Sequence, residues 1–209
     1  MSTSRYPTTQ LFSHQYVESA GAVIFSLSKQ QICLVRNTTT NELYLPKGRR
    51  NCNEHRSQTA LREVKEETGL TCTFLPVNMK TRTPPSEEQE YPDEVRELEE
   101  VSGEPFCLAI RELGERDVKL IWWYIVQMDD GVEDDVQRKI IPGDEKFETL
   151  FFGFDEASKV LTFQSDRELV AKALEIVNET LQKESSKFQS VCIVLLHSAK
   201  RASKGAVKE

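Results

Sequence analysis

Residues 48–70, with the sequence GRRNCNEHRSQTALREVKEETGL, restrict the fold and chemistry of this chain more than any other segment. Apolar and acidic positions recur in it at helical spacing, which predicts a helix over residues 56–68 that ends at Gly69. Residues three and four positions apart share one face of a helix. One such face carries three glutamates: Glu63, Glu66 and Glu67. The neighbouring face is apolar, through Ala60, Leu61 and Val64.

Three glutamates on one helix face repel one another unless a cation lies among them. Charge runs on helices are more often solvated surface, so the spacing of the whole segment has to decide between the two interpretations. Carboxylate oxygens are preferred ligands of Mg²⁺, which keeps several waters and also binds substrate phosphates. The glutamates therefore predict a site for Mg²⁺ or Mn²⁺ that acts on a phosphate-containing molecule.

The spacing is regular over the whole segment. Five residues separate Gly48 from Glu54, and seven more precede the run from Arg62 to Leu70. This register matches G-x5-E-x7-R-E-U-x-E-E-x-G-U, in which U is a bulky aliphatic residue, at every specified position. The chain therefore resembles the Nudix hydrolase family. The resemblance implies an α/β fold, with a mixed β-sheet between helices, and an enzyme that hydrolyses pyrophosphate bonds.

The resemblance also implies roles for the glutamates. Glu63 and Glu67 are expected to bind the metal directly. Glu66 is expected to bind the metal or to accept a proton from the attacking water, so Glu66 and Glu63 are the catalytic candidates. The backbone carbonyl of Lys47, just before the motif, is expected to be a further metal ligand.

The other motif residues are expected to hold the site in place. Arg62 should form a buried ion pair with Glu54, because a partly buried charge needs a partner. Gly48 and Gly69 are structural positions of the same motif. Family members also use an acid outside the motif, on the loop before the last helix. Three residues are candidates for it: Asp144, Glu145 and Glu148.

The residues ahead of the motif indicate a class of substrate. In the sequence LPKGRR, cations cluster at the entrance to the predicted metal site. The P-K-G sequence resembles the branch of the family that acts on diadenosine polyphosphates and diphosphoinositol polyphosphates. Both are densely anionic small molecules, which suit clusters of Arg and Lys. The expected substrate ligands are Lys47, Arg49, Arg50, Arg36, Lys80 and Arg82, with Arg138 and Lys139 as further candidates.

Two other functions stay open. One is hydrolysis of a smaller nucleoside diphosphate derivative, such as ADP-ribose, a sugar nucleotide or a cofactor. The other is a non-catalytic binding module, although such modules commonly lose acids of the motif and this chain keeps them. Trp122 and Trp123 bear on the substrate, because neighbours on a strand point to opposite faces. One is expected in the core, and the other could stack on an adenine.

Composition sets the broad class of protein. With 38% hydrophobic residues the chain can bury a core. It has no apolar run of about 18 residues and no signal-peptide pattern, and its cysteines are scattered. These features predict a cytoplasmic protein without a membrane span, with the nucleus as an alternative. The net charge of −7 argues against specific nucleic-acid binding. The oligomeric state is left open.

Residues 16–185 are expected to form one hydrolase domain between an N-terminal arm (residues 1–15) and a C-terminal tail (residues 186–209). Residues 81–104 contain nine acids against two arginines, with three prolines, which predicts an inserted mobile loop. Strand 118–128 is apolar on both faces, as is typical of a central strand. The other predicted elements are strands at 18–27, 31–36, 42–45, 71–80, 106–113 and 146–154, and an amphipathic helix at 166–183.

Overall fold

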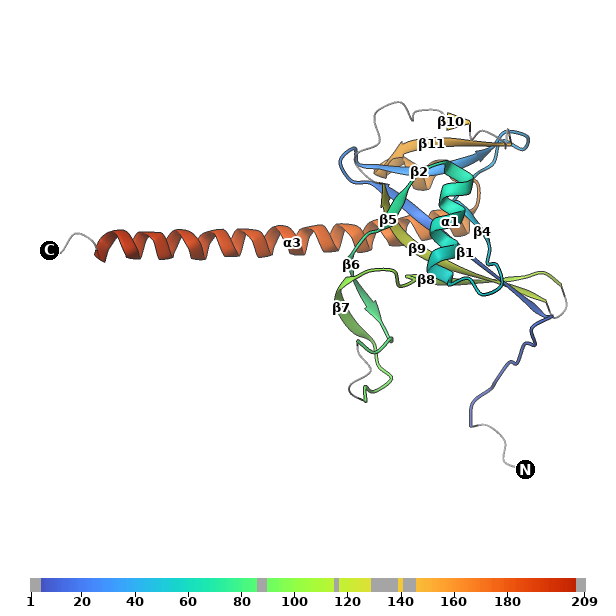
Figure 1. Cartoon of the computed structure of the whole chain (residues 1–209), viewed down its shortest axis with the longest axis horizontal. Helices are drawn as coiled ribbons and strands as arrows, with labels where there is room; N and C mark the ends of the chain where they lie inside the picture. The colour runs from blue at the N-terminus through green and yellow to red at the C-terminus, as the bar shows by residue number, and fades with distance from the viewer. Residues whose placement is uncertain (1–4, 86–89, 115–116, 129–138, 141–145, 206–209) are drawn as a thin grey trace. The chain divides into compact units, whose positions relative to one another are not determined.

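The computed structural model of the protein describes residues 5–85, 90–114, 117–128, 139–140 and 146–205, with the backbone alone at 139–140 and 188–205. The chain divides into two compact units. The first comprises Met1–Pro76 and Val101–Ala173, and the second comprises Val77–Glu100 and Leu174–Glu209. Figure 1 labels the elements along the chain.

A mixed β-sheet forms the centre of the first unit (Figure 1). Its order is β10-β11-β2-β1-β9-β5, and three short strands pair beside this path: β3 with β2, β4 with β1, and β8 with β9. The bounds of these strands are β1 Tyr16–Ser26, β2 Gln31–Asn37, β3 Leu43–Tyr44, β4 Lys47–Arg49, β5 Cys72–Phe74, β8 Cys107–Glu112, β9 Val118–Met128, β10 Lys139–Ile140 and β11 Phe147–Gly153.

The core of the sheet follows the predicted pattern. β1 and β2 form the expected antiparallel hairpin. β9 lies parallel to β1, from the pair Tyr16–Val118 to the pair Phe25–Gln127. Because β9 also pairs with β5 and β8, it lies inside the sheet, as its apolar sequence predicts. β4 is an addition to the predicted elements, in a Pro- and Gly-containing segment that is typical of a turn.

Helix α1 (Arg56–Thr68) has the bounds predicted from the motif. Ala60 and Val64 belong to the same buried cluster as Ala22 of β1, so α1 covers one face of the sheet. Gly69 ends the helix in the left-handed conformation with a φ of 72°, and its N–H donates to the Lys65 carbonyl at 2.9 Å. Glycine adopts this conformation at low cost, which explains the glycine at this position of the motif.

Helices α2 (Phe154–Val160) and α3 (Gln164–Gly205) follow β11. The rings of Phe154 and Phe25 meet edge-on, with centroids 5.6 Å apart. Along β1, Phe25 alternates with the residues that pack against α1, so α2 lies on the opposite face of the sheet. The first turns of α3 also bury apolar side chains, including Val170. The fold class is therefore the predicted one, a mixed sheet between helices.

The second unit contains strand β6 (Val77–Thr81), nearly all of strand β7 (Arg96–Val101) and most of α3. Two predictions are corrected here. The predicted strand over residues 71–80 is two strands in different sheets, because Pro76 lies between β5 and β6. Residues 81–104 are not a loop throughout, because β7 lies among them and pairs with β6.

The acidic side chains of β7 have cationic partners within the second unit. Glu97 and Glu99 are two residues apart on β7 and so share one face of the strand. Lys183 and Lys187 lie one helical turn apart on α3. Lys183 forms an ion pair with Glu97, and Lys187 Nζ lies 2.7 Å from Glu99 Oε2. Part of the acidic run is therefore a strand, and two of its glutamates pair with lysines far along the chain.

Helix α3 continues to Gly205, well beyond the predicted end at Lys183. The segment predicted as a tail is thus helical as far as residue 205. Among the described residues, no helix is both long and apolar enough to cross a membrane.

Candidate active site

The three helix glutamates (Glu63, Glu66 and Glu67) differ in their surroundings. Glu63 is 8% exposed, whereas the side chain of Glu66 is 57% exposed. Glu67 is partly buried, and its Oε2 accepts a hydrogen bond from the Lys47 N–H at 3.1 Å. Burial raises the pKa of Glu67 to about 7, while the charge and the N–H of Lys47 oppose this rise. Helix α1 thus presents two sheltered carboxylates and one that faces solvent.

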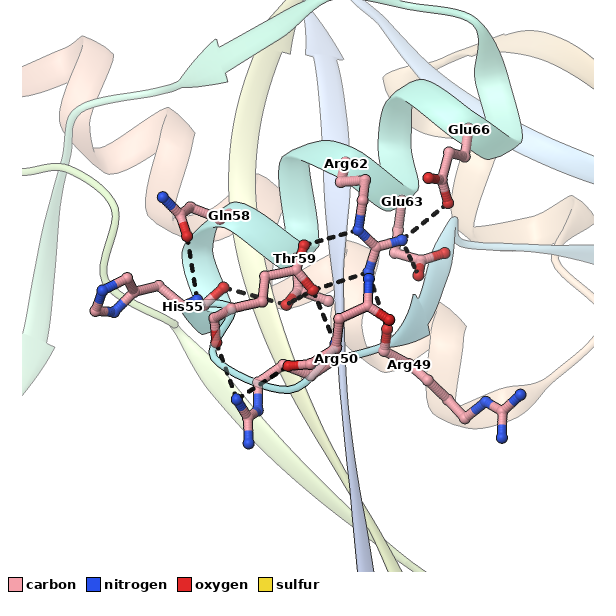
Figure 2. A network of polar contacts seen from close by, with 10 residues as sticks. Arg49, Arg50, His55, Gln58, Thr59, Arg62, Glu63 and Glu66 are labelled. Carbon is pink, nitrogen blue, oxygen red and sulfur yellow. Dashed lines mark hydrogen bonds and ion pairs between the residues drawn. The ribbon is translucent and has the colours of Figure 1, made fainter.

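The guanidinium of Arg62 connects α1 to the residues before it (Figure 2). Its Nη1 donates to Glu63 Oε1 at 2.6 Å and to Glu66 Oε2 at 2.8 Å. Its Nε and Nη2 donate to the two carboxylate oxygens of Glu54 at 2.7 and 3.0 Å. Nη2 also donates to the Arg49 carbonyl at 2.9 Å. The structure therefore contains the expected pair of Arg62 with Glu54, and the same cation binds two of the helix glutamates.

Glu54 fastens the connecting loop (residues 50–55) to the helix. Its Oε2 accepts the Asn51 N–H and the Thr59 hydroxyl, both at 2.9 Å. The hydrogen bond from Arg62, supported by those from Asn51 and Thr59, lowers the pKa of Glu54 to about 2. The Glu54 carboxylate therefore stays ionised near neutral pH, where it keeps its charged contact with Arg62.

A row of cations lies on the face of the sheet opposite α1, and the charges of Lys47 and Lys119 still act on the Glu67 carboxylate. This cationic row consists of Lys47 and Arg49 of β4, Arg111 of β8 and Lys119 of β9. The registers of β4, β8 and β9 place the four residues on one face of the sheet, and Arg111 stands directly opposite Lys119. Burial lowers the pKa of Lys119, and the charges of Lys47, Arg111 and Arg49 lower it further. Like charges directly opposite each other repel, so a bound anion would stabilise this arrangement.

Lys47 and Arg49 are predicted from the sequence as substrate ligands, whereas Arg111 and Lys119 are not. A signal for Lys119 exists, because it is the one charged residue in the apolar run 118–128. No comparable signal marks Arg111, which becomes notable only through its pairing with Lys119 across β8 and β9.

Asp166, in the first turn of α3, is also not predicted from the sequence as a site residue. It is 4% exposed, and burial raises the pKa of its carboxyl group. A hydrogen bond with the Leu45 backbone and the charges of Lys47 and Arg111 oppose the rise. A buried acid therefore stands near both Lys47 and Arg111 of the cationic row.

Two predicted substrate ligands already have carboxylate partners. Arg50 Nε lies 2.9 Å from Glu18 Oε2, and Arg36 forms an ion pair with Glu148. Both cations are paired within the protein in this structure, and their assignment as substrate ligands stays a prediction. Glu148, a candidate for the acid outside the motif, is 8% exposed and bound to Arg36.

The other predicted ligands belong to the second unit or fall outside the described residues. Lys80 and Arg82 belong to the second unit, where Arg82 Nη1 lies 3.1 Å from Asp93 Oδ1. Substrate binding by these two residues stays a prediction. Arg138, Asp144 and Glu145 fall outside the described residues, as does the side chain of Lys139.

The two neighbouring tryptophans both pack against other parts of the protein. Trp123 is 1% exposed and belongs to the core. Trp122 lies on the opposite face, where the Arg56 guanidinium carbon sits 4.2 Å from its ring centroid. Its indole N–H donates to Glu18 Oε1 at 3.2 Å. Arg56 therefore occupies a ring face on which an adenine could have stacked.

The chemistry of the donors fits a divalent cation. Glu63 and Glu67 are sheltered carboxylates on one helix face, and burial raises the pKa of each, as expected of acids that lack a full complement of charge partners. The Lys47 backbone faces Glu67. Within the described part of the chain, no group of three or more His, Cys, Asp or Glu stands assembled around a metal position. Two of the helix carboxylates, Glu63 and Glu66, bind the Arg62 guanidinium.

A family model matches most of the chain. Residues 15–174 match the model of the NUDIX domain. No curated protein matches the chain. A C. elegans Ap4A hydrolase structure is 15% identical, with coverage of 76% of this chain and 96% of that chain and a TM-score of 0.47. The E. coli ORF135 protein is 17% identical, with coverage of 77% and 91% and a TM-score of 0.47. A NUDIX hydrolase from Nitrosomonas europaea is 20% identical, with coverage of 76% and 86% and a TM-score of 0.45. These structural similarities carry no argument about the substrate.

Proposed function

The chain belongs to the NUDIX family and is a hydrolase of pyrophosphate bonds, and we propose that its substrates are densely anionic small molecules. The first candidates are diphosphoinositol polyphosphates and diadenosine polyphosphates. One observation supports this choice above the others: Arg111 and Lys119 stand opposite each other, with Lys47 and Arg49 near enough to lower the pKa of Lys119. A substrate with several phosphates would relieve this repulsion more fully than a substrate with one pyrophosphate.

The helix glutamates supply the proposed metal site. Glu63 and Glu67 would hold Mg²⁺ or Mn²⁺, together with the backbone carbonyl of Lys47. A divalent ion neutralises phosphate oxygens and lowers the pKa of a bound water. For Glu63 to bind the ion and Glu66 to accept a proton, Arg62 must release both carboxylates while it keeps its two contacts with Glu54.

The other side chains of the site would accept a proton and orient the substrate. Glu66, to which the family resemblance assigns the acceptance of a proton from the attacking water, is the most exposed of the three glutamates. Lys47 and Lys119 are partly buried, so their contacts with phosphate oxygens would be less screened by solvent than those of Arg49 and Arg111. The cationic row would thus orient the substrate, while α1 supplies the groups that act on the scissile bond.

Between the two first candidates, the inositol compound is favoured. Trp123 is buried in the core and Arg56 covers Trp122, so neither tryptophan offers an open platform for an adenine. An inositol ring needs no such platform, because its phosphates supply the contacts. This preference rests on these two aromatic residues.

A substrate panel tests the function. The protein is incubated with Mg²⁺ or Mn²⁺ and a diphosphoinositol polyphosphate, diadenosine polyphosphates of several lengths, ADP-ribose or a nucleoside triphosphate. Release of phosphate from the inositol compound, at a higher kcat/KM than for the others, is expected. Preference for ADP-ribose would support the smaller-substrate alternative, and inactivity with every substrate and metal would support a binding module.

Two variants test the residue roles. Glu66→Gln should lower kcat by about 10²- to 10⁴-fold while Mn²⁺ still binds, because it loses a proton acceptor. Near-normal turnover would remove Glu66 from this role. Lys119→Gln should raise KM for the most phosphorylated substrate more than for ADP-ribose. Lys159→Gln, on the exposed surface of α2, is the matched control and should leave both KM values unchanged.

A further inference from the structure

One carboxylate of the sheet holds both ends of the connecting loop. Glu18 lies on β1, and its side chain is only 10% exposed. Its Oε2 accepts a hydrogen bond from Arg50 Nε at 2.9 Å, where the loop begins. Its Oε1 accepts one at 2.7 Å from Nε of Arg56, the first residue of α1. A single sheltered charge therefore spans the segment that joins β4 to α1.

Arg50 carries this restraint into the loop backbone. Its Nη1 donates to the Asn51 carbonyl at 3.2 Å and to the Glu54 carbonyl at 3.0 Å (Figure 2). Its own N–H donates to the Glu18 carbonyl at 3.0 Å. Since the Glu54 side chain binds Arg62, an unbroken series of contacts leads from Glu18 to the cation that holds the helix glutamates.

Arg56 carries the restraint into the start of the helix. Its guanidinium lies between the Glu18 carboxylate and the ring of Trp122, 4.2 Å from the ring centroid. The indole N–H of Trp122 donates to Glu18 Oε1 at 3.2 Å. A cation–π contact and a charged hydrogen bond together restrict a long side chain that is otherwise half exposed.

We propose that Glu18 is a positioning residue of the metal site, and that it acts through Arg50 and Arg56 rather than by contact with metal or substrate. This inference rests on the proposed function. Loss of the Glu18 charge leaves two arginines around an uncharged group, so the connecting loop is released at both ends. Glu54 and Arg62 then hold Glu63 and Glu66 less firmly, and the glutamates no longer share one preferred geometry.

The test uses Glu18→Gln in the full chain, because glutamine keeps the shape of the side chain and removes its charge. Mn²⁺ alone is titrated by calorimetry, and hydrogen exchange is followed at the amides of residues 50–55. We expect the Mn²⁺ Kd to rise about tenfold, as for other groups that orient metal ligands. We expect faster exchange in the loop, and a kcat that falls at saturating Mn²⁺ while the substrate KM is unchanged.

A matched control separates positioning from loss of stability. Ile32→Val shortens a fully buried side chain on β2 and should lower Tm without moving the Mn²⁺ Kd. If Glu18→Gln and Ile32→Val behave alike, with an Mn²⁺ Kd and loop exchange within twofold of wild type, Glu18 only supports the fold and the inference is overturned.

A second variant keeps the test open if Glu18→Gln does not fold. Arg50→Gln should reproduce the weaker Mn²⁺ binding and the faster loop exchange, and the double variant should be no weaker than the worse single variant if both act in one series. An unchanged Kd in Arg50→Gln overturns the route through Arg50. Because Mn²⁺ binding and exchange need no substrate, they decide this point even if the substrate panel shows no hydrolysis.

Discussion

The Glu63 carboxylate fills the space into which a side chain at Gly48 would project. A Cβ built on Gly48 would lie 1.8 Å from Glu63 Oε2 and 2.2 Å from Oε1. No side chain can approach a carboxylate so closely, so a Cβ at this position would displace the Glu63 carboxylate from where it lies. The first glycine of the motif is therefore a packing requirement of the glutamate that lies fifteen residues later in the sequence.

Gly48→Ala should displace the Glu63 carboxylate and weaken metal binding. We expect the Mn²⁺ Kd to rise at least about tenfold, because a ligand that loses its orientation loses affinity on this scale. Calorimetric titration with Mn²⁺ measures the change. Gly114→Ala is the control, since a Cβ at Gly114 would have no atom within 4 Å. Equal affinity in both variants would contradict the packing argument.

Arg62→Lys should destabilise the protein. Arg62 binds Glu54 through two nitrogens and Glu63 and Glu66 through a third, and a lysine cannot reproduce this planar fork. We expect the free energy of unfolding to fall by about 2 kcal/mol, between the values for surface and buried ion pairs. Urea denaturation without metal measures it. Glu66→Gln removes only one exposed contact and should cost less than about 1 kcal/mol.

The pair of Glu54 with Arg62 should make stability depend on acid pH. Arg62 lowers the pKa of Glu54 from its ordinary value of 4.5 to about 2 in the folded protein. The ionised carboxylate therefore stabilises the fold above pH 4.5, and this contribution is lost as the pH falls toward 2. With allowance for solvent screening, its size is on the order of 1 kcal/mol.

The measurement compares wild type with Glu54→Gln by urea denaturation across this pH range. Glutamine does not titrate, so the free energy of unfolding of the variant should decline less steeply with acid than that of wild type. Parallel curves for the two proteins would show that Glu54 does not carry this dependence.

Thr180→Val should weaken the second unit. Thr180 Oγ1 accepts the Asn78 N–H at 2.9 Å, and both residues are buried. Valine has the same shape but no acceptor, so the Asn78 N–H would be left without a partner at a cost of about 1–3 kcal/mol. Hydrogen exchange at Asn78 should become faster. Thr180→Ser keeps the hydroxyl and should protect this amide far better than valine does.

Sequence reasoning succeeds where the signal is local. Periodicity and a terminal glycine predict α1 with its observed bounds, and enrichment in β-branched and apolar residues predicts the hairpin of β1 and β2. The partner of Arg62 is also found, because the spacing of the motif places Glu54 in the residues just before the helix.

It fails where the decisive contact is remote. β7 reads as part of an acidic loop, yet Lys183 and Lys187 pair with its glutamates from far along the chain. Arg50 pairs with Glu18 of β1, a partner that nothing in the local sequence indicates. In both cases composition reports the charge but not its partner.

The amino-acid sequence alone predicts a helix with a carboxylate edge and a glycine-terminated end, because helical spacing acts over a few residues. The resemblance to the family adds the pair of Arg62 with Glu54. Only the tertiary structure decides which cations stand together. Arg111 and Lys119 face each other through the register of β8 and β9, and Glu18 reaches Arg50 and Arg56 through the pairing of β1 and β4. These relationships depend on which strands become neighbours, and that follows from burial of the whole sheet rather than from any one segment.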